Sequence, residues 1–216
     1  KTFSTPHGGC GPGSGPVGVT RELKPFLPEP VIRKAGNHFF IDQKDDRSIG
    51  RISHFYGNVG VVLKAYAFLR TNGKEHLSDI AKLSTLNANY VKESLKDTFK
   101  LPIDAHCKHE FVFDGLIDKS TGVTTYDISK RLLDYGIHPP TMYFPLLYKE
   151  SMMIEPVENE SKQTLDHFIK TMKIIAKEAI DDPDLVKHAP HTTPVKRLDE
   201  AKAAREPKVK FKDLIA

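Results

Sequence analysis

The clearest helical pattern in the chain is KQTLDHFIKTMKIIAKEAI, at residues 162–180. Its apolar side chains recur every three or four positions and form one stripe: Leu165, Phe168, Ile169, Met172, Ile175, Ala176 and Ala179. Asp181, Asp182 and Pro183 follow at once, and a proline in that position predicts the end of a helix. The stripe predicts a helix that lies with one face on other apolar elements.

Three segments before this helix have the pattern of strands. His109–Leu116 alternates between apolar and polar residues, and a turn follows it at Asp118–Gly122. Thr141–Leu147 and Met152–Val157 are apolar, and the polar residues 149–151 lie between them. We therefore expect these two segments to be strands joined by a turn.

A second helix is predicted between the first and second of these strands. Thr124 can cap its start, and Asp127, three residues later, completes a capping box. Gly136 ends it, and its buried stripe consists of Ile128, Leu132 and Leu133. The order strand, helix, strand, strand, helix predicts a compact α+β unit.

Two further helices are predicted upstream of that unit. They cover Asn58–Thr71 and Glu75–Thr98, and Gly73 separates them. Residues 36–58 are polar and mixed, which predicts mostly loop with a short strand at His38–Ile41. Residues 184–216 have little apolar content and are expected to form an extended arm or a surface wrap.

Glycine and proline dominate residues 1–30, which predicts neither a helix nor a central strand there. Residues 13–18, GSGPVG, fit the G-x-G-x-x-G pattern of dinucleotide-binding loops. That pattern needs a strand before it and a helix after it, whereas here glycines and prolines precede it and Pro25 follows. Two interpretations stay open: a loop whose backbone passes close to a ligand or another chain, and a flexible linker.

Composition narrows the class of protein. With 39% hydrophobic and 28% charged residues, the 216-residue chain has the balance of a folded domain, and its apolar runs are too short to span a membrane. Two cysteines, Cys10 and Cys107, cannot form a disulfide framework, which favours a reducing compartment. The net charge of +4 is concentrated after residue 186, so no basic face for nucleic acid is predicted.

Residues 106–110, HCKHE, concentrate side chains that can bind metals. A zinc site usually needs ligands from two separated pairs, and the chain has neither a second cysteine pair nor a His-Glu-x-x-His motif. We therefore predict no metal site. Glu155 follows an apolar strand, where a carboxylate at the rim of a sheet can meet a substrate or can simply end the strand.

A series of short segments then forms an ordered set along the chain: KTF at 1–3, TPHGG at 5–9, GPG at 11–13, GPVGV at 15–19, LNANY at 86–90, HEF at 109–111, LLDYGIH at 132–138, PTM at 140–142, MIEPVENES at 153–161 and PHTTP at 190–194. The set resembles the glycine-cleavage P-protein family, the decarboxylating glycine dehydrogenases. PHTTP resembles the second subunit of the two-subunit bacterial form.

The resemblance implies a fold and a chemistry. The fold would be α/β and aminotransferase-like, that of fold type I enzymes dependent on pyridoxal 5'-phosphate, with the end of the large domain followed by a small α+β C-terminal domain. Lys1 matches the lysine that bonds to the cofactor. The loop of His7, Gly8, Gly9, Cys10 and Gly11 would cover the active site, and glycine would be decarboxylated, its aminomethyl group passing to the lipoyl arm of the H-protein.

Two departures from the family pattern qualify this expectation. Cys10 stands where the family usually has glycine, and its side chain narrows the loop. The family's stacking residue, its partner of the pyridinium nitrogen and most of its phosphate contacts lie upstream of the lysine, so no residue of this chain can be given those roles. We therefore expect that residues 1–216 alone do not decarboxylate glycine.

The resemblance also implies an organisation and partners. The predicted segments are residues 1–45 as the end of the cofactor-binding domain, 46–100 as connecting helices, 101–183 as the small domain and 184–216 as a basic tail. The expected partners are P-protein subunit 1, lipoylated H-protein and glycine, in a cytoplasmic hetero-oligomer without nucleic acid or membrane. Two alternatives are another fold type I enzyme, such as an aminotransferase or desulfurase, and a non-catalytic assembly fragment.

Overall fold

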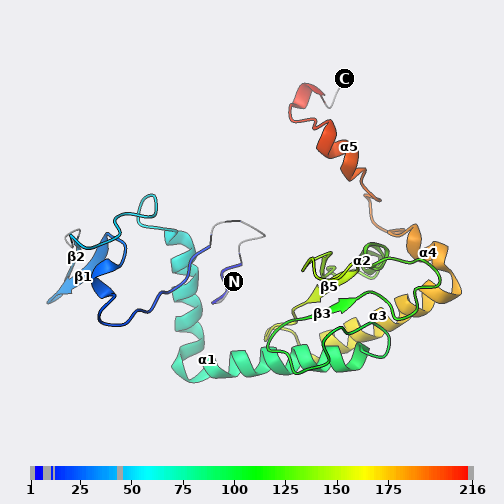
Figure 1. The fold of residues 1–216 in the computed structure, drawn as a ribbon, viewed down its shortest axis with the longest axis horizontal. Coiled ribbons are helices and arrows are strands. Elements are labelled where there is room, and N and C mark those ends of the chain that lie inside the picture. Colours follow the sequence, from blue (N-terminus) through cyan, green and yellow to red (C-terminus); the bar gives the residue numbers. More distant parts are fainter. Residues whose placement is uncertain (1–2, 7–10, 12, 43–45, 214–216) are drawn as a thin grey trace. The chain divides into compact units, whose positions relative to one another are not determined.

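A computed structural model describes residues 3–6, 11, 13–42 and 46–213 of the chain (Figure 1). The chain divides into two compact units, Lys1–Leu77 and Ser78–Ala216. Each unit is described here by itself. The four predicted segments have other boundaries than these units and stay a prediction.

The first unit contains a hairpin and the start of a long helix. A 3-10 turn, η1, covers Lys24–Phe26, and strands β1 (Val31–Ala35) and β2 (His38–Asp42) pair antiparallel. Gly36, with φ of 56°, supplies the left-handed backbone that the tight turn between the strands needs. The short strand predicted at His38–Ile41 is confirmed as β2, whereas β1 was not predicted.

This first unit has almost no interior. Among its described residues only Thr5 is buried. Both faces of the hairpin are exposed, including Ile32, Phe39 and Phe40. A two-stranded hairpin is marginally stable by itself in water, so the apolar side chains of this unit need a cover that the unit does not supply.

Helix α1 covers Val59–Leu95 and is interrupted at Gly73, which has φ of 72° and ψ of 172°. This break confirms the prediction of two helices separated by Gly73. Residues with a side chain rarely adopt a positive φ, and a Cβ on Gly73 would lie 3.2 Å from Oε2 of Glu75. Glycine is therefore the residue that this break requires.

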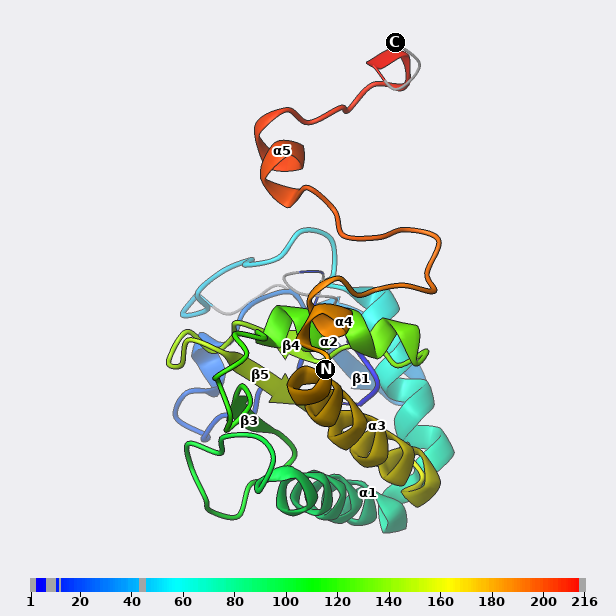
Figure 2. The same ribbon diagram turned by 90° about the vertical axis from the view of Figure 1, so that its right-hand side faces the viewer.

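The second unit is a sheet with one face covered by helices. Strands β3 (Phe111–Asp114), β5 (Ser151–Ile154) and β4 (Thr141–Met142) form an antiparallel sheet in that spatial order. Phe111 lies opposite Ile154 and Phe113 opposite Met152, and all four are buried. The core around them also contains Val91, Leu95, Phe99, Ile128, Leu132, Leu165, Met172 and Ile175. Figures 1 and 2 show the later part of α1 running alongside the β3–β5–β4 sheet.

Helices α2 (Thr125–Asp134) and α3 (Lys162–Asp181) confirm the two strongest sequence patterns. The capping box of α2 is present, because Thr124 accepts the Asp127 N–H and Asp127 accepts the Thr124 N–H. Ser161 caps α3 by accepting the N–H of Thr164. These findings confirm the predicted α+β unit.

The strand predicted at Thr141–Leu147 is wrong beyond Met142. Tyr143 has a φ of 54°, which leaves the extended conformation, and Pro145 has no N–H for a sheet. The strand predicted at Met152–Val157 runs instead from Ser151 to Ile154, before Pro156.

The C-terminal segment is partly helical, which differs from the predicted extended arm. Asp182 accepts the N–H of Leu185, and Pro183 occupies the first turn of α4 (Pro183–Lys187). Helix α5 covers Glu200–Arg205, and a 3-10 turn, η2, covers Phe211–Asp213. None of the helices in the described ranges is both long and apolar enough to cross a membrane.

A carboxylate at the end of α2 fixes the segment after α4. Oδ1 of Asp134 accepts hydrogen bonds from the His191 N–H at 2.6 Å, the Thr192 N–H at 2.7 Å and the Thr192 hydroxyl at 2.9 Å. Its other oxygen accepts from Arg131. Arg131 also makes a two-bond pair with Glu178 of α3, with both distances 2.9 Å.

A second attachment lies at the start of α2. Arg197 donates to Oδ1 of Asp127 at 2.8 Å and to the carbonyl of Ala189 at 2.7 Å, and its guanidinium lies over the ring of Tyr126. The segment from Ala189 to Arg197 is thus held at both ends of α2.

The Asp134→Ala substitution should destabilise the chain and release this segment. It leaves two backbone N–H groups without their acceptor, at an expected cost of about 1–3 kcal/mol in the free energy of unfolding. Urea denaturation measures the cost, and faster tryptic cleavage after Lys196 reports the release. Asp181→Ala, which removes an exposed pair with Lys177, is the control and should change stability by less than about 0.5 kcal/mol.

Stability should also fall in acid. Hydrogen bonds from Arg131 lower the pKa of Glu178 below its ordinary value of 4.5, although burial opposes this. Burial disfavours ionisation of Asp134, but bonds from Thr192, Arg131 and His191 outweigh it and lower that pKa below 3.8.

Both carboxylates therefore bind protons more weakly in the folded than in the unfolded chain. Their stabilisation is fully present above the unfolded pKa values and is lost as the pH falls through the folded ones. Urea midpoints between pH 7 and pH 3 should fall below about pH 4.5. Glu178→Gln should flatten that decline, and an unchanged profile would contradict the assignment.

Candidate functional site

Most residues of the predicted active-site loop lie outside the described residues. His7, Gly8, Gly9 and Cys10 of this loop lie outside the described residues, and so does Lys1. Gly11 is described, lies in a bend and is partly exposed. The roles given to these residues therefore stay predictions.

Phe3 and Ser4, at the start of the described part of the chain, have a strained backbone. Phe3 and Ser4 have φ of 61° and 59°, a left-handed conformation that side chains other than glycine rarely adopt. The ring of Phe3 lies 6.4 Å from that of Phe68 on α1, and Thr5 is buried. Strain of this kind persists only where the surroundings fix the backbone, and it gathers at active sites.

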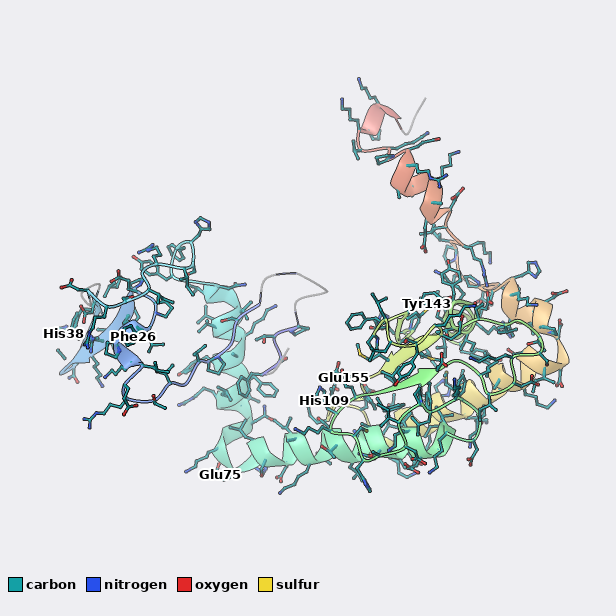
Figure 3. The ribbon with its side chains drawn as sticks, viewed as in Figure 1. Phe26, His38, Glu75, His109, Tyr143 and Glu155 are labelled. Atoms are coloured by element: carbon teal, nitrogen blue, oxygen red, sulfur yellow. The ribbon has the colours of Figure 1, made fainter. Side chains whose placement is uncertain are left out.

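A cluster of chemically active side chains lies at one end of the β3–β5–β4 sheet, beside the ends of the strands. His109 and Glu110 directly precede β3, and Glu155 directly follows β5. Since Phe111 pairs with Ile154, antiparallel pairing brings these ends together. Nε2 of His109 lies 3.8 Å from Oε1 of Glu155 (Figure 3). We call these three residues the rim cluster.

The loop before β3 is held by side chains of α1. Asn89 donates to the Cys107 carbonyl at 2.8 Å, and its own oxygen accepts the Cys107 N–H at 3.2 Å. Lys92, which is buried, donates its ammonium to the carbonyl of Ala105. Helix α1 therefore fixes the backbone that leads to His109.

The loop after β5 is held by the same stretch of α1. Asn87 donates to the carbonyls of Val157 at 3.0 Å and Glu160 at 3.3 Å, and Ser84 donates to Glu158. Both flanks of the rim cluster thus depend on one short stretch of α1. The sequence LNANY at 86–90 supplies both asparagines.

Tyr90 continues this stretch toward α3. Its hydroxyl donates to Asp166, and Lys162 donates to the other oxygen of that carboxylate at 2.6 Å. Hydrogen bonds from Lys162 and Tyr90 lower the pKa of Asp166, so the acceptor stays ionised near neutral pH. The start of α3 is therefore tied to α1.

Cys107 is not part of the rim cluster, although His109 and Glu110 from the same segment are. Burial raises the pKa of the Cys107 thiol, with the charge of Lys92 opposing the shift. A protonated thiol is a poor ligand and a poor nucleophile. Cys107 instead serves through its backbone, which Asn89 binds.

The rim cluster can accept or donate a proton and can attract a cation. One donor atom each from His109, Glu110 and Glu155 lies within 4.8 Å of the others. The imidazole and one carboxylate are largely open to water, which weakens electrostatic attraction there. His109 and Glu155 can therefore act as an acid–base pair at the end of the sheet where β3 begins and β5 ends.

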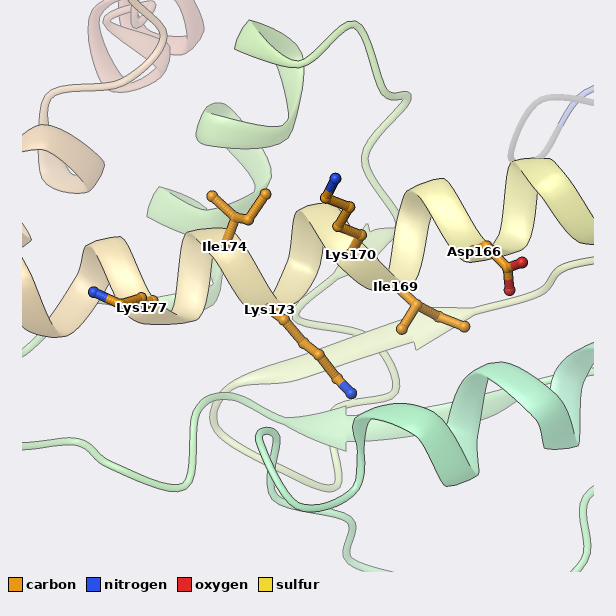
Figure 4. A pocket seen from close by; sticks show the side chains of 6 residues that line it. All are labelled: Asp166, Ile169, Lys170, Lys173, Ile174 and Lys177. Carbon is orange, nitrogen blue, oxygen red and sulfur yellow. The ribbon is translucent and has the colours of Figure 1, made fainter.

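The outer side of α3 carries a shallow groove with a different character. Lys170, Lys173 and Lys177 surround Ile169 and Ile174 in Figure 4. A row of lysines with methylene stems over partly buried isoleucines is typical of a solvated helix face. We assign this face no site.

The sequence singled out His109, Glu110 and Glu155 as chemically active side chains. It marked LNANY only as a family segment, without the positioning role of its two asparagines. A signal existed, because asparagine is unfavourable inside a helix unless its side chain has a partner. Asn87 and Asn89 lie two apart and so could be expected to reach different partners.

The Asn89→Ala substitution should open the loop before β3. Loss of both bonds to Cys107 should cost about 1–3 kcal/mol in the free energy of unfolding and should raise the rate of Cys107 alkylation about tenfold. Peptide mass mapping with iodoacetamide separates Cys107 from Cys10. Asn72→Ala, which removes a bond to the Phe68 carbonyl of its own helix, is the control. Equal Cys107 rates in both variants would contradict the role of Asn89.

Comparison with known proteins points to one group. Residues 80–196 match the family described as "Glycine dehydrogenase, C-terminal domain". Proteins of Staphylococcus aureus (strain bovine RF122 / ET3-1) and Staphylococcus haemolyticus (strain JCSC1435) are 55% identical over 214 residues. Both are named "Probable glycine dehydrogenase (decarboxylating) subunit 2". The alignment covers 99% of this chain but only 44% of either relative.

A solved structure has the same fold. The crystal structure of glycine decarboxylase (P-protein) of the glycine cleavage system, in inhibitor-bound form, matches with a TM-score of 0.55 at 14% identity. The match covers 72% of this chain and 37% of that chain. It confirms the predicted fold class.

Proposed function

The chain belongs to the glycine dehydrogenase C-terminal domain family, and from that premise we propose that it is the part of a decarboxylating subunit that ends the cofactor-binding domain and adds the small domain. The full-length subunit would decarboxylate glycine. It would transfer the remaining aminomethyl group to the lipoyl arm of the H-protein.

One observation carries this proposal: the segments that resemble the family contact one another. LNANY binds the loop before HEF through Asn89 and the loop of MIEPVENES through Asn87. LLDYGIH binds PHTTP through Asp134. Segments that are far apart in the sequence thus form two structural clusters, which supports their interpretation as parts of one folded domain of this family.

Lys1 would hold pyridoxal 5'-phosphate through its amine. The strained backbone at Phe3 and Ser4 supports this role, because a fixed backbone so near the lysine would limit where its side chain can reach. When bound, the cofactor supplies an electron sink for the negative charge left by the departing carboxylate. His7, Gly8, Gly9, Cys10 and Gly11 would cover the substrate and leave room for the lipoyl arm.

The rim cluster would act by moving protons. His109 and Glu155 are near enough that a group placed between them can exchange a proton with either. Glu110 offers a further carboxylate oxygen within 4.8 Å of these two groups. The asparagines of α1 would keep both side chains in position.

The partners follow from the same proposal. The relatives are named as a second subunit, which supports P-protein subunit 1 as the partner in a hetero-oligomer. Lipoylated H-protein and glycine would be the substrates, in the cytoplasm.

The Lys1→Ala substitution tests the proposal in the full-length subunit, assembled with subunit 1 and lipoylated H-protein. Glycine–bicarbonate exchange should fall by a factor of at least about 10³, since a nucleophile and anchor is lost. The absorbance of protein-bound cofactor should shift to that of the free aldehyde. Circular dichroism checks that the variant is folded.

Lys1→Arg separates charge from chemistry, because arginine keeps the positive charge but cannot replace the lysine amine. It should be as inactive as Lys1→Ala. Lys108→Ala, an exposed lysine beside the rim cluster, should keep exchange within about twofold. Activity retained by Lys1→Ala would refute the role of Lys1.

A further inference from the structure

The second unit presents an apolar loop to solvent. We call Tyr143, Phe144, Pro145, Leu146 and Leu147 the 143–147 loop. Leu146 is 88% exposed, Leu147 77% and Phe144 54%, although the unit has a complete core of its own. Runs of exposed apolar residues are rare in folded proteins unless another surface covers them.

The loop is held in one shape by a buried residue. Ser151, with no exposed surface, donates its hydroxyl toward the carbonyls of Pro145 at 2.6 Å and Tyr148 at 2.9 Å. Its own carbonyl accepts the N–H of Tyr143 at 2.7 Å. A loop fixed before its partner arrives loses little conformational entropy on binding.

The chemistry of the loop favours a permanent contact. Residues 141–148 contain no charged side chain. Permanent interfaces are more apolar than transient ones, and charged residues are depleted at their centres. The occupant should therefore present an apolar surface and should stay in place.

The chain's relatives supply a candidate for that occupant. More than half of the length of each relative lies outside the match, and the matched family is described as a C-terminal domain. Only Thr5 is buried among the described residues of the first unit, so that unit too needs cover from another folded body. A body joined covalently to the chain has a high effective concentration beside it.

We propose that the 143–147 loop docks on the part of the full-length subunit that precedes the residues of this chain. This contact would position the small domain against the domain that precedes it. The inference concerns assembly, and it stands or falls independently of the role of Lys1.

Photo-crosslinking in the full-length subunit tests the contact. Leu147→p-benzoyl-phenylalanine should crosslink to a peptide upstream of the counterpart of Lys1, at a yield at least about fivefold above that of Lys173→p-benzoyl-phenylalanine on the solvated face of α3. Phe144→p-benzoyl-phenylalanine is a second probe, should the first variant fail to fold. Mixing isotopically light and heavy subunits distinguishes contacts within one copy from contacts between two.

Each other outcome overturns the proposal. Crosslinks to residues 1–216 would show that this chain covers its own loop. Crosslinks between light and heavy copies would show a second copy as the occupant. Crosslinks that form only after subunit 1 is added would show that subunit 1 is the occupant, and a yield equal to the Lys173 control would show that the loop stays in water.

Discussion

The amide of Asn89 closes a ring of two hydrogen bonds on the backbone of Cys107, and the arrangement of the site depends on it. A carboxamide can donate and accept at once, so it can replace a strand neighbour for one residue. Asn87 donates hydrogen bonds to the loop after β5. A single turn of α1 therefore holds both loops that flank the rim cluster. A shift of that turn would move His109 and Glu155 together.

The sequence predicted those features of the fold that depend only on residues close together in the chain. The stripe of α3, the capping box at Thr124 and the break at Gly73 are visible in the sequence because each depends on residues within a few positions. The apolar run at 141–147 misled, because the backbone leaves the extended conformation at Tyr143, after only Thr141 and Met142 have paired with β5. The Pro145 carbonyl then accepts the Ser151 hydroxyl and no strand N–H. The hairpin strand β1 was missed because prolines precede it. The distance between His109 and Glu155 depends on the pairing register of β3 and β5. The residues around either side chain do not reveal that register.

The two units differ in how they are stabilised. The second unit buries aromatic and aliphatic side chains from α1, α2, α3 and the sheet, which is enough apolar contact for a fold of its own. The first unit has left-handed residues, a hairpin and a helix start, but its apolar side chains face outward. The described residues of the first unit therefore gain little stability from apolar burial within that unit.

Asp127 has a consequence for the order in which the polypeptide assembles. One of its oxygens closes the start of α2 and the other holds Arg197, which is synthesised seventy residues later. The guanidinium can find that oxygen in place only after the first helical turn has formed. The later-synthesised segment that contains Arg197 would therefore bind a helix that had already nucleated, and an error in that nucleus would leave this segment unattached.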